Sequence, residues 1–274
     1  MENTEKSHVR ADNVKAAAGT IRALARLGVG AGDRFLDLGA NVCAVSNWAC
    51  AQGCDAVVAY EPFPLALERA TPAPGVQLFP CAVTSDGRNI TMAISKEAAE
   101  RDYLCSAHAV VKPNSSHTVF ADIPSMAIAH VVESHNPTII KLDIEGGEYE
   151  VLAALDDFSG VRGMFIEWHG CNSPAQAVLM PLLAHKLRRN GLVPSFGWPR
   201  NASWDARSAG RTMLGVGFWR ETLFVRGEPE PACEASLDVM VDGARRLVAE
   251  KTWAGSGRFL APSLVEKLVA EELA

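Results

Sequence analysis

The chain has 274 residues, of which 48% are hydrophobic and 21% are charged, and its formal net charge at pH 7 is -6. A chain of this length can bury a sizeable core, and its acidic balance argues against a nucleic-acid surface built on lysine and arginine. Seven cysteines, an odd number at irregular spacings, fit a reducing compartment better than a disulfide framework. The start of the chain lacks the apolar stretch of a secretory signal, and no apolar run is long enough to cross a membrane. We therefore expect a cytoplasmic protein without a membrane partner.

The first elements predict a nucleoside pocket. Apolar residues at helical spacing over 9–27 stop at the glycines of 28–30, which predicts an N-terminal helical cap over residues 1–30. Residues 34–60 then read as strand, turn, helix (44–51) and strand; the first apolar run ends in Asp37-Leu38-Gly39-Ala40-Asn41, where the turn lies, and Glu61 follows the second strand. Small residues in such a turn let the backbone approach a ligand, and an acid at this separation can accept hydrogen bonds from ribose hydroxyls.

The alternation of strands and helices continues along the chain and predicts an α/β fold. Strands are predicted at 76–79, 89–94, 138–143, 163–168, 192–196, 213–216 and 221–225, and helices at 65–70, 127–133, 148–155 and about 174–189. Residues 95–117 are predicted to form a loop-rich insertion, and residues 197–211 a connecting loop. A linker at 227–231 leads to two amphipathic helices, which pack either on the sheet or on a second subunit. The predicted domains are therefore the cap (1–30), a catalytic domain (31–226) and a C-terminal helical extension (227–274).

Three segments together resemble the FkbM family of S-adenosylmethionine-dependent methyltransferases over roughly residues 10–226. They are Asp37-Leu38-Gly39-Ala40-Asn41-Val42, Tyr60-Glu61-Pro62 and Lys141-Leu142-Asp143-Ile144-Glu145-Gly146-Gly147-Glu148. The resemblance implies a Rossmann-like class I methyltransferase. The sheet that this resemblance implies is mostly parallel and seven-stranded, with an antiparallel strand near one edge and helices on both faces. It also implies, most often, O-methylation of a small molecule or a sugar in a biosynthetic or natural-product pathway. The family commonly has glycine where this chain has Cys43, so affinity for the cofactor depends on whether that residue takes a positive φ.

Each part of S-adenosylmethionine has a predicted partner. We expect Glu61 to bind the ribose, and the turn backbone with the following helix N-terminus to bind the methionine carboxylate. Asp37 faces the methionine ammonium or anchors the turn, and the Asn41 side chain either contacts the cofactor or is there because asparagine tolerates a left-handed backbone. The end of the third strand borders the adenine. The predicted cofactor-binding residues are Asp37, Gly39, Ala40, Asn41, Glu61, Pro62, Ala82 and Asp143.

A hydroxyl acceptor must lose a proton, and the predicted catalytic residues are His169, Asp143 and Glu145. Asp143 and Glu145 follow one buried strand, and His169 ends the next, so their side chains are expected around one crevice. Histidine suits a base near neutral pH. The alternatives are a histidine satisfied by a neighbouring carboxylate, and helix capping by Glu145 and Glu148, which we favour for Glu148.

Several weaker candidates accompany this set. Tyr103, Ser106 and His108 in the insertion are candidate substrate contacts. The tryptophans at 198, 204 and 219 form either an apolar substrate wall or part of the core. A divalent metal held by Asp143, Glu145, Glu167, His169 and His108 has no ligand spacing in its favour, so no metal is predicted.

Two other functional classes are alternatives to a methyltransferase. A nicotinamide-dependent oxidoreductase normally uses Gly-x-Gly-x-x-Gly, but positions 39, 41 and 44 are Gly, Asn and Ala, which favours a cofactor without phosphates. A catalytically silent partner protein would keep the fold and use the C-terminal helices for docking. The leading prediction is an enzyme that methylates a small-molecule acceptor, with no nucleic-acid partner and with the C-terminal helices as the surface for any homodimer.

Overall fold

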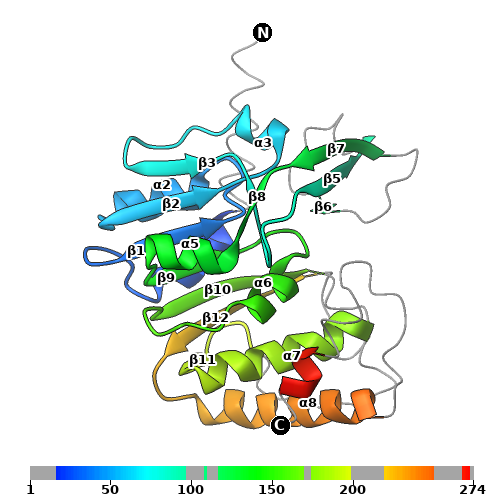
Figure 1. The fold of residues 1–274 in the computed structure, drawn as a ribbon. Helices are drawn as coiled ribbons and strands as arrows, with labels where there is room; N and C mark the ends of the chain where they lie inside the picture. The colour runs from blue at the N-terminus through cyan, green and yellow to red at the C-terminus, as the bar shows by residue number, and fades with distance from the viewer. Residues whose placement is uncertain are drawn as a thin grey trace. The chain divides into compact units, whose positions relative to one another are not determined.

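The computed structural model describes residues 17–96, 108–109, 117–169, 174–198, 219–249 and 267–271. The chain forms two compact units, residues 1–145 and residues 146–274. Seven of its strands have the sheet order β11-β12-β10-β9-β1-β2-β3 (Figure 1). Strand β12, next to the edge, is antiparallel to both of its neighbours. The Rossmann-like class I fold with one antiparallel strand near the edge is therefore confirmed.

The first unit contributes four parallel strands. These are β1 (Arg34–Leu38), β2 (Ala56–Tyr60), β3 (Val76–Phe79) and β9 (Ile139–Leu142). Strand β1 lies between β2 and β9 and pairs in parallel with both, and β3 pairs with β2. Chain order therefore reverses at β1, and in open parallel sheets ligands bind outside the carboxyl ends of the strands at such a point.

The helices of the first unit follow the sequence pattern closely. Helix α2 (Ala44–Ala51) has the predicted bounds, whereas α3 (Pro64–Leu67) is shorter than predicted and has its proline in the first turn. Helix α5 (Ile128–His135) ends at Asn136, whose left-handed backbone closes it. Residues 17–25 are helical, as predicted, and residues 9–16 lie outside the described part of the chain.

Two small sheets accompany these strands in the first unit. Strands β5 (Ile90–Ser95), β6 (His108–Ala109) and β7 (His117–Ile123) form an antiparallel sheet in the order β6-β5-β7, and β4 (Ala82–Thr84) pairs in parallel with β8 (Ser125–Ala127). The sequence predicted β5 only. Strands β4, β6 and β8 are too short to show a period, and β7 lacks the alternation of buried and exposed residues that a period of two requires.

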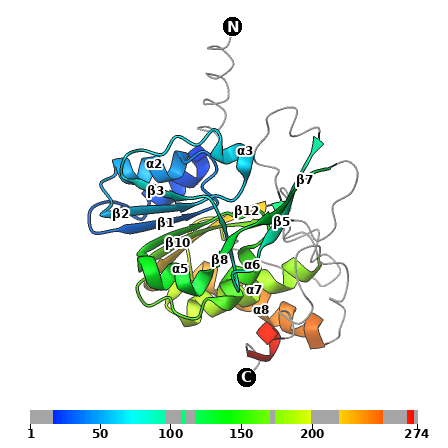
Figure 2. The ribbon, with the colours of Figure 1, turned by 45° about the horizontal axis from the view of Figure 1, so that its top comes forward.

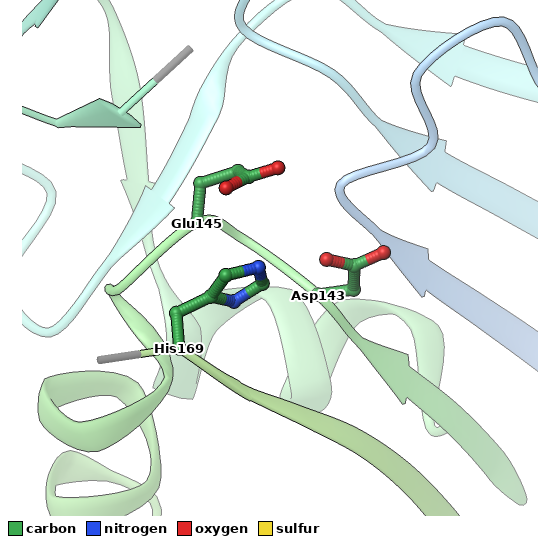
Figure 3. Close-up of side chains that lie close together, drawn as sticks. All are labelled: Asp143, Glu145 and His169. Atoms are coloured by element: carbon green, nitrogen blue, oxygen red, sulfur yellow. The ribbon is translucent and has the colours of Figure 1, made fainter. Parts of the chain in front are cut away.

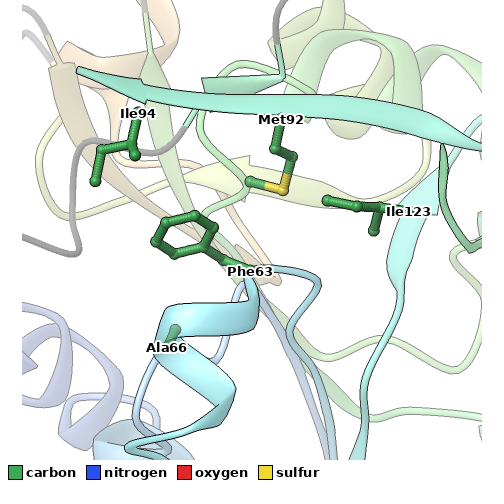
Figure 4. Close-up of a cluster of buried hydrophobic side chains, with 5 residues drawn as sticks. All are labelled: Phe63, Ala66, Met92, Ile94 and Ile123. Carbon is green, nitrogen blue, oxygen red and sulfur yellow. The ribbon is translucent and has the colours of Figure 1, made fainter. Parts of the chain in front are cut away.

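An apolar cluster joins helix α3 to strands β5 and β7 (Figure 4). Its buried members are Phe63, Ala66, Met92, Ile94 and Ile123. The ring of Phe120 meets that of Phe63 edge-on, with the centroids 5.3 Å apart. The cluster therefore fixes the residue that lies two positions after Glu61.

The second unit contains three strands and its own helices. They are α6 (Glu148–Ala154), β10 (Gly163–His169), α7 (Pro174–Arg189), β11 (Leu192–Pro194), β12 (Trp219–Arg226) and α8 (Pro231–Ala249). Helix α8 packs against α7, and the two lie side by side in both views (Figure 2). Arg188 and Asp238 form an ion pair of 2.6 Å between them. The predicted strand at 213–216 and most of the predicted loop at 197–211 lie outside the described residues.

Helix α8 buries an apolar stripe within its own unit, made of Cys233, Leu237, Met240, Val241, Ala244 and Leu247. The sequence predicted packing on the sheet or on a second subunit, whereas α8 packs mainly on helix α7 of the same chain. A short helix at residues 267–271 follows. None of the described helices combines the length and the apolar character that a membrane span requires.

Candidate active site

The turn after β1 can be built only with glycine at position 39. Gly39 has φ +83°, and a Cβ there would lie 1.7 Å from the carbonyl oxygen of Asp143. The backbone N–H groups of Gly39 and Ala40 both donate to the carbonyl oxygen of Tyr60, at 3.0 Å each. The turn is thereby fastened to the ends of β2 and β9, the two neighbours of β1.

Two further residues of the turn have positive φ although they are not glycine. Asn41 has φ +50° and Cys43 has φ +67°. Asparagine adopts this conformation more readily than most residues, so the backbone alone accounts for Asn41, and a side-chain contact with the cofactor stays a prediction. Cys43 is fully buried and does occupy a backbone conformation that favours glycine.

Helix α2 starts at Ala44, directly after the turn. No side chain among the described residues caps its first turn, and that turn contains no acidic residue. The first N–H groups of a helix attract anions. This helix end therefore suits the carboxylate of a ligand.

Glu61 is 6% exposed and is held by backbone donors on both sides. Its Oε2 accepts the N–H of Asn41 at 2.6 Å, and its Oε1 accepts the N–H of Phe63 at 2.8 Å. Burial raises the pKa of this carboxyl to about 7, and the two N–H donors offset part of the effect. Each carboxylate oxygen can accept a second hydrogen bond, so the residue can still receive ribose hydroxyls.

Asp37 and Asp143 share one buried cation. The Lys141 ammonium lies 3.2 Å from Oδ1 of Asp37 and 3.1 Å from Oδ2 of Asp143. Ser46 donates its hydroxyl to the other oxygen of Asp37, at 2.5 Å. Asp37 is 0% exposed, whereas the Asp143 side chain is 24% exposed. This burial favours Asp37 as the anchor of the turn and Asp143 as the acid that meets a ligand.

Glu145 has an unusual backbone conformation, with φ +57°. A non-glycine residue in the left-handed region stores strain, and such strain concentrates at functional sites. Figure 3 draws Glu145 and Asp143 on the segment after β9, and His169 at the end of β10. The strain at Glu145 agrees with its place among the predicted catalytic residues, and its role stays a prediction.

In the second unit, His169 is paired with Glu148. Nδ1 of His169 lies 2.9 Å from Oε1 of Glu148. Glu148 is 0% exposed, and the backbone N–H of Gly146 donates to both of its oxygens, at 3.2 and 3.0 Å. Nε2 of His169 lies 3.7 Å from Oε1 of Glu167, beyond hydrogen-bonding distance. Glu148 therefore accepts the N–H of Gly146, just before α6, and also orients the imidazole. The capping hydrogen bond expected of its side chain is absent from the N-cap of α6 among the described residues.

The sequence profile of the methyltransferase FkbM domain matches residues 29–191. The chain belongs to the FkbM methyltransferase family. This confirms the resemblance carried by the three sequence segments. S-adenosylmethionine, the predicted cofactor, is the one that this membership supports.

Solved methyltransferase structures are also similar to this FkbM methyltransferase. A putative S-adenosylmethionine-dependent methyltransferase from Listeria monocytogenes is 10% identical, with a TM-score of 0.43, over 79% of this chain and 100% of that chain. A TehB-like methyltransferase from Corynebacterium glutamicum is 14% identical, with a TM-score of 0.38, over 82% of this chain and 99% of that chain. A putative tRNA (m1A22) methyltransferase from Streptococcus pneumoniae, in complex with S-adenosyl-L-methionine, is 13% identical, with a TM-score of 0.37, over 90% and 94% of the two chains. No curated protein matches this chain.

The chemistry of the residues in the first unit fits the cofactor of an FkbM methyltransferase. A carboxylate with acceptor capacity for a diol is present at Glu61, a helix end without a side-chain cap at α2, and a partly exposed carboxylate for a cation at Asp143. Pro62 is half-buried beside Glu61, and Ala82 is buried in β4, where its N–H donates to the carbonyl oxygen of Pro124. Their contacts with the cofactor stay predictions.

The weaker sequence candidates have different outcomes in this FkbM methyltransferase. The Trp198 side chain is buried, and its ring meets that of Phe224 at 6.0 Å, so it belongs to the core of the second unit. His108 lies in β6. Tyr103, Ser106 and Trp204 lie outside the described residues. Sequence reasoning missed Lys141 as a member of the site, and it valued Glu148 as a helix cap only.

Proposed function

We propose that this protein transfers a methyl group from S-adenosylmethionine to a hydroxyl oxygen of a small molecule, with His169 as the general base. The pairing of Glu148 with Nδ1 of His169 carries the proposal. A neutral hydroxyl is a weak nucleophile until its proton is removed, so a base fixed beside the acceptor has a defined task in O-methylation.

The protein residues then divide the work. Glu148 accepts a hydrogen bond from Nδ1–H of His169. This bond holds the imidazole in the tautomer whose Nε2 can take a proton from the acceptor. The buried carboxylate also stabilises the imidazolium that forms, while Glu61 and Asp143 hold the cofactor. The cofactor supplies an electrophilic methyl group on a sulfonium. Displacement on that methyl group is in line, and positioning of the reactants lowers its barrier without a covalent step on the enzyme.

A small-molecule acceptor agrees with the charge of the chain. A net charge of -6 gives little attraction for a polyanion such as RNA or DNA. In this proposal residues 31–226 are the catalytic domain of a cytoplasmic biosynthetic enzyme, flanked by the cap at 1–30 and the extension at 227–274. The extension is the candidate surface for a homodimer.

The experiment offers the protein S-adenosylmethionine with a labelled methyl group and a panel of small alcohols, phenols, sugars, amines and carboxylic acids. Mass spectrometry then identifies the methylated atom. With an accepted hydroxyl substrate, His169→Asn should lower kcat about 100-fold or more, because proton removal is lost. Calorimetry should find an unchanged cofactor Kd.

The matched control is His130→Asn, which changes an exposed histidine on α5 and should leave both quantities as they are. Normal turnover in His169→Asn would refute the base assignment. Methylation of nitrogen only would refute the choice of acceptor. A wild-type protein that binds S-adenosylmethionine but methylates nothing in the panel or in a small-molecule extract would support the catalytically silent alternative.

A further inference from the structure

Lys141 is a buried cation that the proposed chemistry does not use. It is 3% exposed, and its ammonium contacts three oxygens. It donates to the carbonyl oxygen of Gly39 at 2.5 Å and pairs with Asp37 at 3.2 Å and with Asp143 at 3.1 Å. An ammonium has three N–H donors, so these three oxygens match its full capacity.

The position of Lys141 in β9 places it beside the turn that follows β1, where we expect the cofactor to bind. In the parallel pairing of β1 with β9, Lys141 lies opposite Asp37, two positions before Gly39. Its partners are Asp37, the second-last residue of β1, Gly39, which follows β1, and Asp143, which follows β9. The ammonium therefore ties together both strand ends at the point where the chain order of the sheet reverses.

The contact with the Gly39 carbonyl bears directly on the ribose site. Gly39 has φ +83°, and a glycine peptide can rotate at low cost unless its carbonyl is held. The same turn presents the N–H of Ala40 to Tyr60 and the N–H of Asn41 to Glu61. A rotated peptide after Gly39 would withdraw the Ala40 N–H from Tyr60 and move the Asn41 N–H away from Glu61.

We infer that Lys141 is a positioning residue for the cofactor. Its ammonium holds the Gly39–Ala40 peptide in one orientation, so that Asn41 stays hydrogen-bonded to Glu61. The inference rests on the proposed use of Glu61 as the ribose ligand. The surrounding charges favour the protonated form of Lys141, which this role requires. Burial alone lowers the pKa of the Lys141 ammonium, but the carboxylates of Asp143 and Asp37 outweigh it, and the pKa is raised above its usual value.

The test is the substitution Lys141→Met, which keeps the length and apolar stem of the side chain and removes the ammonium. Two measurements follow. Calorimetry with S-adenosylmethionine and with S-adenosylhomocysteine should show Kd values raised about 10-fold, the cost of one lost charge-assisted hydrogen bond. In the protein without cofactor, the amide proton of Asn41 should move upfield in the NMR spectrum, because its short bond to Glu61 is lost.

The matched control is Thr138→Val, at the amino ends of the same two strands. Thr138 accepts the N–H of Arg34 at 3.0 Å and donates to Asp33 at 2.9 Å, so this change also removes partly buried hydrogen bonds between the β1 and β9 segments. It should lower the melting temperature and leave both the Kd and the Asn41 amide unchanged.

The outcomes are separable. An unmoved Asn41 amide in Lys141→Met, or an equal loss of affinity in Thr138→Val, would overturn the inference. If Lys141→Met does not fold, the pair Asp37→Asn with Lys141→Gln removes one charge of each sign, and the same amide is read there. A wild-type protein that binds no cofactor would contradict the proposed function, while the Asn41 amide would still test Lys141.

Discussion

Among the residues that the structure describes, each unit contains one buried glutamate, and the two differ in what they face. Glu61 is 6% exposed and Glu148 is 0% exposed, and both accept backbone N–H groups. Glu148 also holds a histidine ring, whereas the hydrogen bonds described for Glu61 come from the N–H groups of Asn41 and Phe63 alone. In the proposed function the same side chain, at similar burial, orients the base in one unit and keeps acceptor capacity for hydroxyls in the other.

The largest effect should come from removing the charge that orients His169. Glu148→Gln keeps the size of the side chain, but the amide can donate to Nδ1 and select the wrong tautomer, so kcat should fall about 100-fold, as in His169→Asn. The Kd for S-adenosylmethionine should stay at the wild-type value, since Glu148 binds the Gly146 N–H and His169 and is not one of the predicted cofactor ligands. Steady-state kinetics measures kcat, and calorimetry measures the Kd. Glu150→Gln, two residues further along α6, is the matched control, and equal losses in both variants would refute a special role for Glu148.

The opposite pattern, a changed Kd with an unchanged kcat, is expected at Glu61. Glu61→Gln leaves the backbone contacts of one oxygen but weakens acceptance of the ribose hydroxyls, so the Kd should rise about 10-fold. At saturating cofactor, kcat should return to the wild-type value. A fall in kcat at saturation would show that Glu61 and Glu148 do not have separate roles.

Because burial raises the pKa of Glu61 to about 7, cofactor affinity should also depend on pH. The ionised carboxylate accepts hydroxyl protons better than the neutral acid, so binding should tighten as the pH rises through about 7 and then level off. For stability the sign is opposite. The folded state holds this proton more tightly than the unfolded chain, so this group's contribution falls between its ordinary pKa of 4.5 and about 7. Calorimetry from pH 6 to pH 8 on wild type and Glu61→Gln tests this, and the variant should lose the pH dependence of binding.

The smallest effect is expected at Cys43, which neighbours the Glu61 site only through the turn. A non-glycine residue in the left-handed region costs about 1–2 kcal/mol, so Cys43→Gly should relieve strain. The gain is offset by the loss of a buried side chain and by the larger entropy of an unfolded glycine. We expect the free energy of unfolding to change by less than about 1 kcal/mol, and the cofactor Kd to stay the same or to fall slightly. Denaturant titration and calorimetry measure both, and a weakened affinity would mean that the thiol itself supports the pocket.

The sequence predicted the strands that carry the first unit's candidate ligand groups and named His169, but it did not predict the partner of His169. The Asp37–Asn41 turn and Glu61 follow strands long enough to show a period, so their places at strand ends could be inferred. Lys141 was not singled out, because a lysine inside an apolar run shows its importance only when the strand register sets it opposite Asp37. Glu148 was assigned to helix capping, since its contact with His169 joins residues 21 positions apart and no local pattern reports it.

The pairing of Asp37 with Lys141 across β1 and β9 also has an evolutionary consequence. Adjacent residues of a strand point to opposite faces, so a one-residue insertion or deletion in β9 would turn the lysine away from the aspartate and leave a buried carboxylate without its cation. Such length changes should therefore be eliminated from β9 in descendants of this chain.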